Sequence, residues 1–478
     1  MSDVIRLVPD LTVIAVLLVG VALFRTPLMA KHGNRLAALA MLLGVALTIG
    51  RDGIAHPVLL MLSMGAGAGL GWWFAAQVNM VQIPAMVAFQ HGAGGLAAGL
   101  VAYVELLGNR DALTSSGLSV GVVGLFLGMA TFSASLVASG KLSGRIRSTP
   151  HSLPFHGALL LLLVSNAVLV AFLAFIFDGA VPAVLLLISA AISIAVGVLF
   201  AMRVGGADMP VLISFLNATA GLAAAACGIV LQNRLLIAFG ATVAASGSIL
   251  THIMCKGMNR RLSGVFAGHQ GKTKFRPFEI FNVDQASPAA SADSGEKPVD
   301  VLVSSIEAVR RSNTVVIIPG YGMALAQAQF KVVQLANRLR ELGKQVKFAI
   351  HPVAGRMPGH MHVLLAEADV DYALLHEMDE VNDEFKTTDL ALVVGACDVV
   401  NPAAMQIEGT PLSGMPILMA QDASSVIVCN LDRKPGYSGV ENLLYRSPNA
   451  MLLLGDARNT VGSLLDALED TETSIAAA

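Results

Sequence analysis

Charged side chains are scarce in this chain of 478 residues. Asp, Glu, Lys and Arg together make up 13% of the sequence, whereas apolar residues make up 55%. An ordinary soluble domain carries about 25% charged residues. Most of the chain is therefore predicted to face an environment other than water.

An excess of positive charge is also missing. Lys and Arg number 31 and Asp and Glu number 33, which gives a formal net charge of −2. A protein that binds nucleic acid needs a concentrated basic face. The charge balance therefore argues against a nucleic-acid partner.

Cysteine is rare and widely spaced. The four cysteines are Cys227, Cys255, Cys397 and Cys429, and no two of them have a C-x-x-C spacing. A disulfide framework and a zinc site both need closely patterned cysteines. We expect neither, and we assign no metal ligands.

Long apolar runs fill the first half of the chain. Nine runs approach the ~20 residues that cross a ~30 Å hydrocarbon core. An odd number of spans puts the termini on opposite sides of the membrane. The spans are Val8 to Phe24, Leu36 to Ile49, Val58 to Val78, Ala85 to Leu107, Leu118 to Ala138, Ala158 to Phe177, Val181 to Met202, Val211 to Leu231 and Leu235 to Met254.

Basic residues between the spans set the orientation, because cytoplasmic loops retain Lys and Arg. One set of loops holds Arg25, Lys31, Arg35, Lys141, Arg145, Arg147, Arg203, Lys256, Arg260 and Arg261, and the other holds Arg6, Arg51, Arg110 and Arg234. This bias predicts a multi-pass protein of the inner (plasma) membrane, in contact with lipid, with the C-terminal half in the cytoplasm. The first run lacks a basic n-region and a cleavage site, so we expect it to be a retained span.

Glycine and alanine crowd two of the spans, at Gly65 to Gly69 and at Gly92 to Gly95. Small side chains let helix backbones approach closely in a membrane. Tight helix packing is the expectation for both segments.

His91 and Asn217 are the most informative polar residues within the spans. Each lies seven residues beyond a proline at a cytoplasmic helix entry, Pro84 or Pro210, and so roughly 10 Å deep. Histidine is suited to a reversible proton site near neutral pH, although a single His or Asn can instead be a hydrogen-bond partner between helices. Weaker candidates of the same kind are Gln77, Asn79, Gln82, Gln90, Asn166 and His252.

The composition changes after the ninth run. Gln285 to Pro298 is rich in Ala, Ser, Pro, Asp and Gly, which is typical of a linker. We therefore expect a membrane domain at 1–262, a linker at 263–298 and a domain of about 180 residues at 299–478.

Short apolar runs alternate with helical stretches in the last domain, which predicts an α/β Rossmann-like, doubly wound parallel sheet. The expected strands are Val315 to Ile318, Val346 to Ile350, Tyr372 to Leu375, Leu390 to Val394, Ile417 to Met419, Val426 to Val428 and Met451 to Leu454. The expected helices are Ala324 to Leu342, Val363 to Ala368 and Val461 to Leu468.

Five glycine-containing loops follow these strands, at the carboxyl edge where such sheets bind ligands. The first, starting at Pro319 and Gly320, is an imperfect G-x-G-x-x-G turn with Leu325 at the third position. No Asp or Glu follows the second strand to bind a ribose hydroxyl, as NAD sites require. A plain strand-to-helix turn stays an alternative for the first loop, but five such loops favour a dinucleotide site. The other loops contain Gly355-Arg356, Gly395-Ala396-Cys397-Asp398, Gly436-Tyr437 and Gly455-Asp456-Ala457.

Several strings in the chain resemble the β subunit of the proton-translocating NAD(P) transhydrogenase. They are G-Y-G-M-A-L-A-Q-A-Q from Gly320, H-P-V-A-G-R-M-P-G-H-M from His351, G-Y-S-G-V-E-N from Gly436, A-D-M-P from Ala207 and C-K-G-M-N-R from Cys255. The resemblance implies a proton-conducting membrane domain and a cytoplasmic domain that binds NADP(H). It also implies an NAD(H)-binding α subunit as partner and a second copy of each subunit.

The same resemblance implies roles for individual residues. His91 and Asn217 correspond to residues of proton passage, and Asp208, Lys256 and Arg260 to charges that link the two domains. Asp398 corresponds to an acid near the nicotinamide that is associated with coupling. The loops and the resemblance together give the candidate cofactor-binding residues: Gly320, Tyr321, Gly322, Met323, Ala324, Val353, Ala354, Gly355, Arg356, Met357, Pro358, Gly359, Gly395, Ala396, Cys397, Asp398, Val399, Asn430, Leu431, Asp432, Arg433, Lys434, Gly436, Tyr437, Gly455, Asp456 and Ala457.

The chain departs from that family at two places. The family's Lys-Arg-Ser for the 2′-phosphate is Asn430-Leu431-Asp432 here, although Arg433 and Lys434 follow at once. A carboxylate repels a phosphate, and neighbouring cations can offset it. The family's G-A-N-D also has Cys397 in place of Asn.

Hydride transfer needs two nicotinamide rings roughly 3 to 3.5 Å apart, so one nucleotide site requires a partner that carries the other ring. Coupling to protons would then be conformational and reciprocal. Two alternatives stay open: a channel or transporter whose nucleotide domain is a sensor, and a transhydrogenase-like enzyme that holds NAD(H) at this site because of Asp432.

Overall fold

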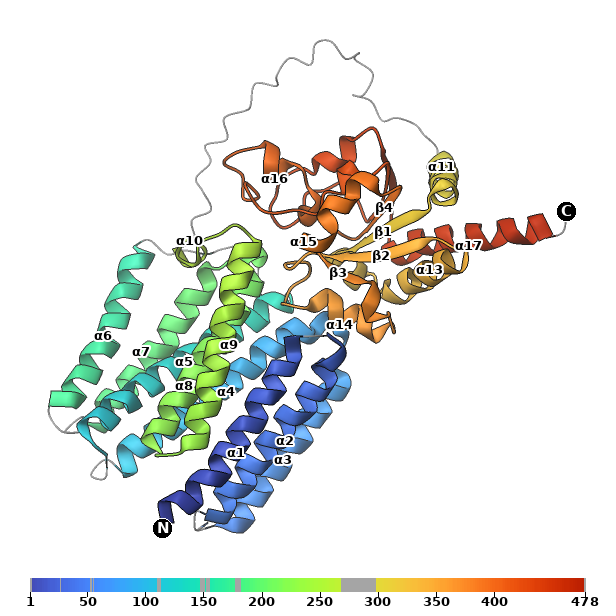
Figure 1. Cartoon of the computed structure of the whole chain (residues 1–478). Helices are drawn as coiled ribbons and strands as arrows, with labels where there is room; N and C mark the ends of the chain where they lie inside the picture. The colour runs from blue at the N-terminus through green and yellow to red at the C-terminus, as the bar shows by residue number, and fades with distance from the viewer. Residues whose placement is uncertain are drawn as a thin grey trace. The chain divides into compact units, whose positions relative to one another are not determined.

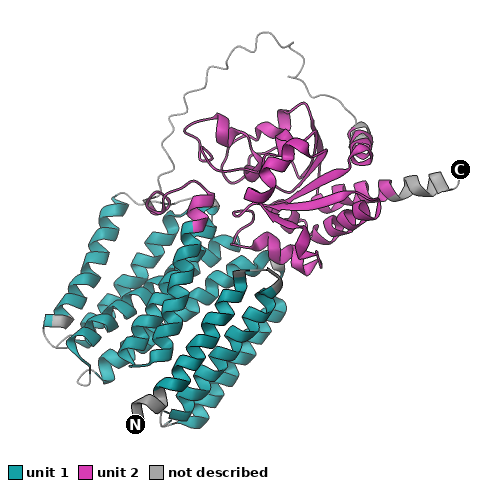
Figure 2. Ribbon diagram, in the orientation of Figure 1, with its two compact units in different colours: residues 1–252 teal, residues 253–478 magenta. Residues whose placement is uncertain are grey.

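The structure is a computed structural model that describes residues 2–25, 27–51, 54, 56–109, 113–146, 151, 155–176, 182–267 and 298–476. The chain divides into two compact units, Met1–His252 and Ile253–Ala478 (Figure 2). The predicted linker stretch Gln285 to Pro298 lies outside the described residues except for Pro298 itself, which begins a helix.

Helices make up the first unit, and each of the nine predicted spans coincides with one of them (Figure 1). Eight of the described helices are long and apolar enough to cross a membrane, and the first contributes a shorter apolar stretch, Leu7–Ala22. The helices are α1 (Ser2–Ala22), α2 (Pro27–Arg51), α3 (Pro57–Gln77), α4 (Ile83–Gly108), α5 (Ser115–Leu142), α6 (His156–Ile176), α7 (Ala183–Arg203), α8 (Met209–Val230) and α9 (Arg234–Gly257).

Helix α5 is the centre of this bundle, because α4, α6, α7 and α8 all pack against it. Glycines make the closest crossings possible. A Cβ on Gly128 would lie 2.6 Å from the carbonyl oxygen of Gly95, and one on Gly197 would lie 2.1 Å from that of Ala130. The tight packing predicted for Gly92 to Gly95 is thus found at Gly92 and Gly95, which contact α5.

The other glycine-rich segment behaves differently. A Cβ on Gly65, Gly67 or Gly69 of α3 would meet no atom of the described chain within 4 Å. Helix α3 contributes no buried residue to the unit. The close approach expected for Gly65 to Gly69 is therefore wrong within the described part of this chain, because no neighbouring helix covers that segment.

A buried lysine closes the end of α7. Lys141, 1% exposed, donates hydrogen bonds from Nζ to the carbonyl oxygens of Ala201, Met202 and Val204 at 3.0, 2.9 and 2.8 Å. The last carbonyls of a helix lack partners within the helix and carry partial negative charge. Lys141 therefore fixes the end of α7, from which the chain enters the short η4 turn (Gly206–Asp208) and then α8.

The second unit contains a sheet of six parallel strands in the order β3-β2-β1-β4-β5-β6, as predicted for a doubly wound domain (Figure 1). The short helix α10 (Leu262–Ala267) precedes it. The strands are β1 (Thr314–Pro319), β2 (Gln345–Ile350), β3 (Leu375–Glu377), β4 (Leu390–Val394), β5 (Ser425–Asn430) and β6 (Ala450–Leu454).

Both faces of this sheet are covered, which explains why its strands are apolar at nearly every position. Alternate residues such as Val316, Ile318, Ala391 and Val393 lie in one core with Phe385. The opposite face packs against α13 (Gln329–Glu341) and α17 (Ala457–Ala476), which contact each other, while α11 (Pro298–Arg311) packs on β6.

Two predicted elements are displaced. The helix expected from Ala324 to Leu342 is broken into α12 (Tyr321–Leu325) and α13, because Gln327 has a positive φ of 50°. The strand expected from Tyr372 begins only at Leu375, because the Asp371 side chain caps a 3₁₀ turn at 372–374 by accepting the N–H of Ala373.

The strand expected from Ile417 to Met419 is wrong. This segment is buried against one face of the sheet, not within it. The side chain of Asn382 forms hydrogen bonds with the backbone of this segment: Nδ2 donates to Ile417 O and Oδ1 accepts the N–H of Met419. An amide side chain thus replaces a neighbouring strand.

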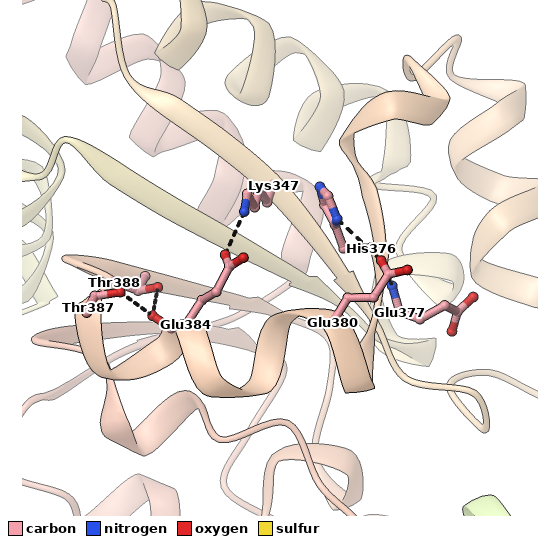
Figure 3. Close-up of polar contacts among 7 residues, drawn as sticks. All are labelled: Lys347, His376, Glu377, Glu380, Glu384, Thr387 and Thr388. Atoms are coloured by element: carbon pink, nitrogen blue, oxygen red, sulfur yellow. Dashed lines mark hydrogen bonds and ion pairs between the residues drawn. The ribbon is translucent and has the colours of Figure 1, made fainter.

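Polar side-chain contacts attach the segment after β3 to the sheet (Figure 3). Lys347 of β2 pairs with Glu384 of η6 (Asn382–Thr387) at 2.6 Å, and His376 pairs with Glu380 of α15 (Met378–Val381) at 3.4 Å. The hydroxyl groups of Thr387 and Thr388 donate to the carbonyl oxygen of Glu384. These contacts hold η6 where Phe385 enters the core.

Candidate functional site

The loops after β1 and β4 meet at the point where the strand order reverses, the usual ligand site of such a sheet. Gly320 N donates to Val394 O at 2.8 Å, and Gly322 N donates to Gly395 O at 2.8 Å. Gly395 N in turn donates to Cys429 O within strand β5. Backbone hydrogen bonds thus link the predicted loops after β1 and β4 and attach the second of them to β5.

Glycine is required where these loops cross. Gly395 has a φ of +67°, and a Cβ there would lie 2.0 Å from the backbone nitrogen of Met323. A Cβ on Gly320 would lie 2.3 Å from Gly395 O. The predicted glycines therefore serve the close approach of two loops.

The backbone N–H groups of the first turn donate hydrogen bonds within the protein. The N–H groups of Gly320, Gly322 and Met323 donate to Val394, Gly395 and Gly320 respectively. They hold the turn and do not face outward as a group of donors. A charged donor from the loop after β2, Arg356, lies at this edge.

Arg356 lies between two tyrosine rings. Its guanidinium carbon is 4.5 Å from the ring centre of Tyr321 and 5.3 Å from that of Tyr437, and Nε donates to the Tyr437 hydroxyl at 3.0 Å. Its backbone N–H donates to Nδ1 of His360, which begins α14 (His360–Glu367). Residues from three loops, all in the predicted set except His360, therefore form one cluster.

Stacking of this kind matters for the chemistry of the arginine. A guanidinium is planar and always charged, and it can donate hydrogen bonds in its own plane while it is stacked on aromatic faces. The cluster thus presents a fixed positive charge that is suited to a phosphate.

His351 supports the loop that carries Arg356. It is 1% exposed, Nε2 contacts Pro416 O at 2.8 Å, and Nδ1 accepts the N–H of Val353 at 3.2 Å. Burial lowers the pKa of His351 to about 4. The ring is therefore neutral near pH 7 and positions Val353 and Ala354.

Asp398 lies beside the loop after β5. Its carboxylate accepts the N–H and the hydroxyl of Ser438 at 3.0 and 2.7 Å. Burial raises the pKa of Asp398, while the hydrogen bonds from Ser438 oppose that rise. A Cβ on Gly436 would lie 2.8 Å from this carboxylate, so the predicted Gly436 allows the approach.

Two residues under this edge, Asn442 and Tyr445, were missed by the sequence reasoning, and they form a hydrogen-bond network with the predicted residues Asn430, Ala396 and Cys397. Asn442 Nδ2 donates to Cys397 O at 3.0 Å, and Asn430 Nδ2 donates to Ala396 O and to the Tyr445 hydroxyl at 2.8 and 2.6 Å. Burial also raises the pKa of the Cys397 thiol. Asn442 belongs to the G-Y-S-G-V-E-N string, which was the one signal available for it.

The residues after Asn430 form an exposed turn. Asp432 Oδ1 accepts the backbone N–H of Lys434 at 3.0 Å, and Oδ2 pairs with its Nζ at 3.1 Å. Leu431 is 74% exposed. The hydrogen bond from the backbone N–H of Lys434, and after it the hydrogen bond from the Lys434 side chain, lower the pKa of Asp432, so this carboxylate is charged at neutral pH.

The remaining predicted residues lie at the same carboxyl edge or directly beneath it. Gly455 N donates to Asn430 O, and Asp456 Oδ1 accepts the N–H of Arg458 at the start of α17. Met323, Ala324, Ala354, Val399 and Ala457 are buried, whereas Val353, Gly355, Met357 and Pro358 are half-buried and Gly359 and Arg433 are exposed.

In the first unit, His91 lies on α4 and Asn217 on α8, and these two helices pack together. Both side chains are half-buried, and Nδ1 of His91 has no hydrogen-bond partner among the described residues. Thr131 of α5 donates to Thr219 of α8 at 2.8 Å, so further hydroxyl groups lie along the same helices.

The three predicted coupling charges lie at helix ends. Asp208, 9% exposed, immediately precedes α8. Lys256 is exposed in the last turn of α9, where a cation complements the helix dipole. Arg260 follows that helix and is half-buried.

Comparison with known proteins decides the family. Residues 8–467 match the model of the NAD(P) transhydrogenase beta subunit. The chain belongs to this family. It is 38% identical over 453 residues to the NAD(P) transhydrogenase subunit beta of Rhodospirillum rubrum. The aligned residues cover 92% of this chain and 94% of the relative. The same subunit from a named strain of that organism matches equally.

Membership of this family confirms the resemblance drawn from the motifs, because the match spans both units. The chain is a transhydrogenase beta subunit with a multi-pass membrane unit and a Rossmann-like sheet. The name of the relatives describes them as the beta subunit of an NAD(P) transhydrogenase.

Proposed function

We propose that this chain is the NADP(H)-binding subunit of a proton-translocating, Re/Si-specific NAD(P) transhydrogenase. It exchanges hydride with NAD(H) held by a partner α subunit and couples that exchange to proton movement across the inner membrane. The nucleotide unit is on the cytoplasmic side, and two copies of the chain assemble with two α subunits.

The observation that carries the proposal is the cluster at the carboxyl edge of the sheet. Arg356, Tyr321 and Tyr437 come together from three loops at the reversal of the strand order. Among the residues that the structure describes, the same chain has eight helices of membrane length. A dinucleotide site and a membrane bundle in one polypeptide are what a gradient-coupled redox subunit requires.

The residues at this edge fit a dinucleotide. Oδ1 of Asn430 is buried and has no hydrogen-bond partner among the described residues. An orphaned buried acceptor at a ligand edge calls for a donor from outside the protein. Arg356 is the matching charge for a phosphate, and the tyrosine rings offer flat apolar surfaces.

When bound, the nicotinamide group carries the hydride. The chain's own residues then have separate tasks. Arg356 binds phosphate and holds the loops after β2 and β5 together. Asp398 accepts two hydrogen bonds from Ser438 and so fixes the loop that contains Tyr437.

The membrane unit supplies the driving force in this proposal. A proton that crosses ~150 mV releases about 3.5 kcal/mol, which shifts an equilibrium several hundredfold. Protonation in the region of His91 and Asn217 biases the affinity of the nucleotide unit through Asp208, Lys256 and Arg260. Coupling of this kind is reciprocal, so nucleotide binding also changes proton affinity.

The test is reconstitution of the chain with an α subunit in sealed vesicles. Hydride exchange between NADH and NADP⁺ is followed with and without an imposed proton gradient. Added nucleotides reach only the chains whose nucleotide unit faces the medium, so we expect the rate and final NADPH ratio to rise when the gradient drives protons from the vesicle lumen to the medium, and to fall when an uncoupler is added. Nucleotide-dependent ion flux without any hydride exchange would instead support a sensor-gated channel.

A further inference from the structure

Lys141 is a buried cation that has no part in the function proposed above. It lies in the last turn of α5 and is 1% exposed. Its Nζ is 3.0, 2.9 and 2.8 Å from the carbonyl oxygens of Ala201, Met202 and Val204. An ammonium group has three N–H donors, which match these three acceptors. Burial of a cation is costly without such hydrogen bonds, so Lys141 ties the end of α5 to the end of α7.

Helix α7 is attached to α5 at a second level as well. The Ser133 hydroxyl donates to Ile194 O at 2.9 Å, and a Cβ on Gly197 would lie 2.1 Å from Ala130 O. The two helices therefore touch in the second half of α7 and again at its end. Because both places are held, this part of α7 moves together with α5.

Helix α5 also packs against α4, which carries His91. A Cβ on the next residue, Gly92, would lie 2.9 Å from Cβ of Ser135. Ser135 is six residues before Lys141, which corresponds to about 9 Å along the helix. One rigid helix thus connects the position next to His91 with the lysine at the end of α7.

The turn between α7 and α8 begins at the last of the three acceptors. Gly205 and Gly206 follow Val204, and two glycines in succession allow the backbone many conformations. Asp208 comes next; it is 9% exposed, and its N–H donates to Gly205 O at 3.1 Å. Asp208 is the fourth residue after Val204, so it lies within about 14 Å of a fixed point.

Opposite charges lie at the two helix ends of this turn. Lys141 supplies a cation at the C-terminal end of α7, and Asp208 a carboxylate at the N-terminal end of α8, so each charge complements a helix dipole. Met209 and Leu212 at the start of α8 are buried, which holds that end too. Without Lys141, three carbonyl oxygens lose a donor and the two glycines become a hinge.

Resting on the proposed function, we propose that Lys141 is a positioning residue for the coupling charge Asp208. It makes α5, the end of α7 and the turn that follows one rigid element, and coupling between sites travels through such elements. A change of protonation at His91 then reaches Asp208 and is not absorbed by the glycines. Without the lysine the chain still exchanges hydride, but the exchange no longer responds to the proton gradient.

Three variants of the full-length chain test the proposal: Lys141→Met, which removes the charge and the donors, Lys141→Gln, which keeps two donors without the charge, and Lys31→Met as control. Lys31 is an exposed lysine of α2. Each chain is reconstituted with an α subunit in sealed vesicles, and hydride exchange is measured with and without a gradient that drives protons to the medium. The ratio of the two rates does not depend on the amount of folded chain, so a loss of stability alone leaves it unchanged.

Coupling between two sites typically amounts to about 5- to 150-fold, so we expect a ratio of at least ~5 in the unchanged chain and in Lys31→Met. In Lys141→Met the ratio should fall to about 1, while the rate without a gradient stays within ~3-fold. Lys141→Gln should give a ratio between these values. The amides of Val204 and Asp208 should exchange hydrogen at least ~10-fold faster in Lys141→Met, because the turn is released.

Ratios in both Lys141 variants equal to that of Lys31→Met would overturn the proposal, and so would unchanged hydrogen exchange of the Val204 and Asp208 amides. Complete loss of hydride exchange, or absence of both Lys141 variants from the membrane, would assign the lysine to the stability of the bundle and overturn the proposal as well. A ratio of about 1 in the unchanged chain would instead contradict the proposed function itself.

Discussion

Arg356 donates a hydrogen bond from Nε to the hydroxyl of Tyr437 at 3.0 Å, although the two residues are 81 positions apart. The contact joins the loop after β2 to the loop after β5. Both loops are at the edge where the proposed nucleotide binds, so the geometry of the site depends on this pair.

Replacement of Arg356 by lysine should weaken NADPH binding about tenfold, because an ammonium group lacks the planar guanidinium that lies between Tyr321 and Tyr437 and donates from Nε and Nη2 to the Tyr437 hydroxyl. The dissociation constant measured by calorimetry checks this. The matched control is Arg340→Lys on α13, which should bind as the unchanged chain does. Equal affinity of Arg356→Lys and the unchanged chain would remove Arg356 from the site.

Replacement of Gly395 by alanine should destabilise the nucleotide unit by at least about 3 kcal/mol. The residue has a φ of +67°, and a Cβ would lie 2.0 Å from Met323 N. The matched control is Gly359→Ala. Gly359 has a φ of +73°, but a Cβ there would meet no described atom within 4 Å, so this change should lower the free energy of unfolding by only about 1 kcal/mol. Urea unfolding followed by hydrogen exchange of the β1 and β4 amides measures both. Similar losses in the two variants would show that the crossing of the two loops is not critical.

The strands of the sheet were predictable because burial on both faces leaves an apolar run in the sequence. Val315 to Ile318 and Leu390 to Val394 are such runs, and both lie inside the observed strands. Ile417 to Met419 has the same composition but is not a strand, since its hydrogen-bond partner is the side chain of Asn382. A hydrophobic pattern indicates that a segment is buried. It does not show which group forms the hydrogen bonds to the backbone of that segment.

The candidate site was predictable loop by loop, because each loop follows a strand and contains glycine. Its internal contacts were not predictable. The stacking of Arg356 between Tyr321 and Tyr437 joins residues that are distant in sequence, and the pairing of Asp432 with Lys434 depends on how one turn closes. Lys141 was counted only as a loop charge, and its place at the end of α7 depends on packing between helices.

The nucleotide unit should lose stability as the pH falls from about 7 toward 4. His351 has a pKa of about 4 when folded and about 6.5 when unfolded, so over this range the unfolded chain binds a proton that the folded chain does not. The resulting loss is about 2 kcal/mol at pH 5. Hydrogen exchange of the β2 amides at several pH values measures it, and His351→Gln should reduce the dependence on pH. The same dependence in both chains would assign the effect to other groups.

Replacement of His91 by glutamine should abolish proton uptake while leaving nucleotide binding intact. A glutamine amide is polar and similar in size to the imidazole, but it does not bind or release a proton near neutral pH. In vesicles that contain the chain and an α subunit, a pH-sensitive dye should report uptake at least ~10-fold slower, with an NADPH dissociation constant within ~2-fold of the unchanged chain. The matched control is His252→Gln, a change at an exposed histidine of α9. Uptake in His91→Gln at the rate of that control would mean that the unpaired Nδ1 of His91 has no part in proton passage.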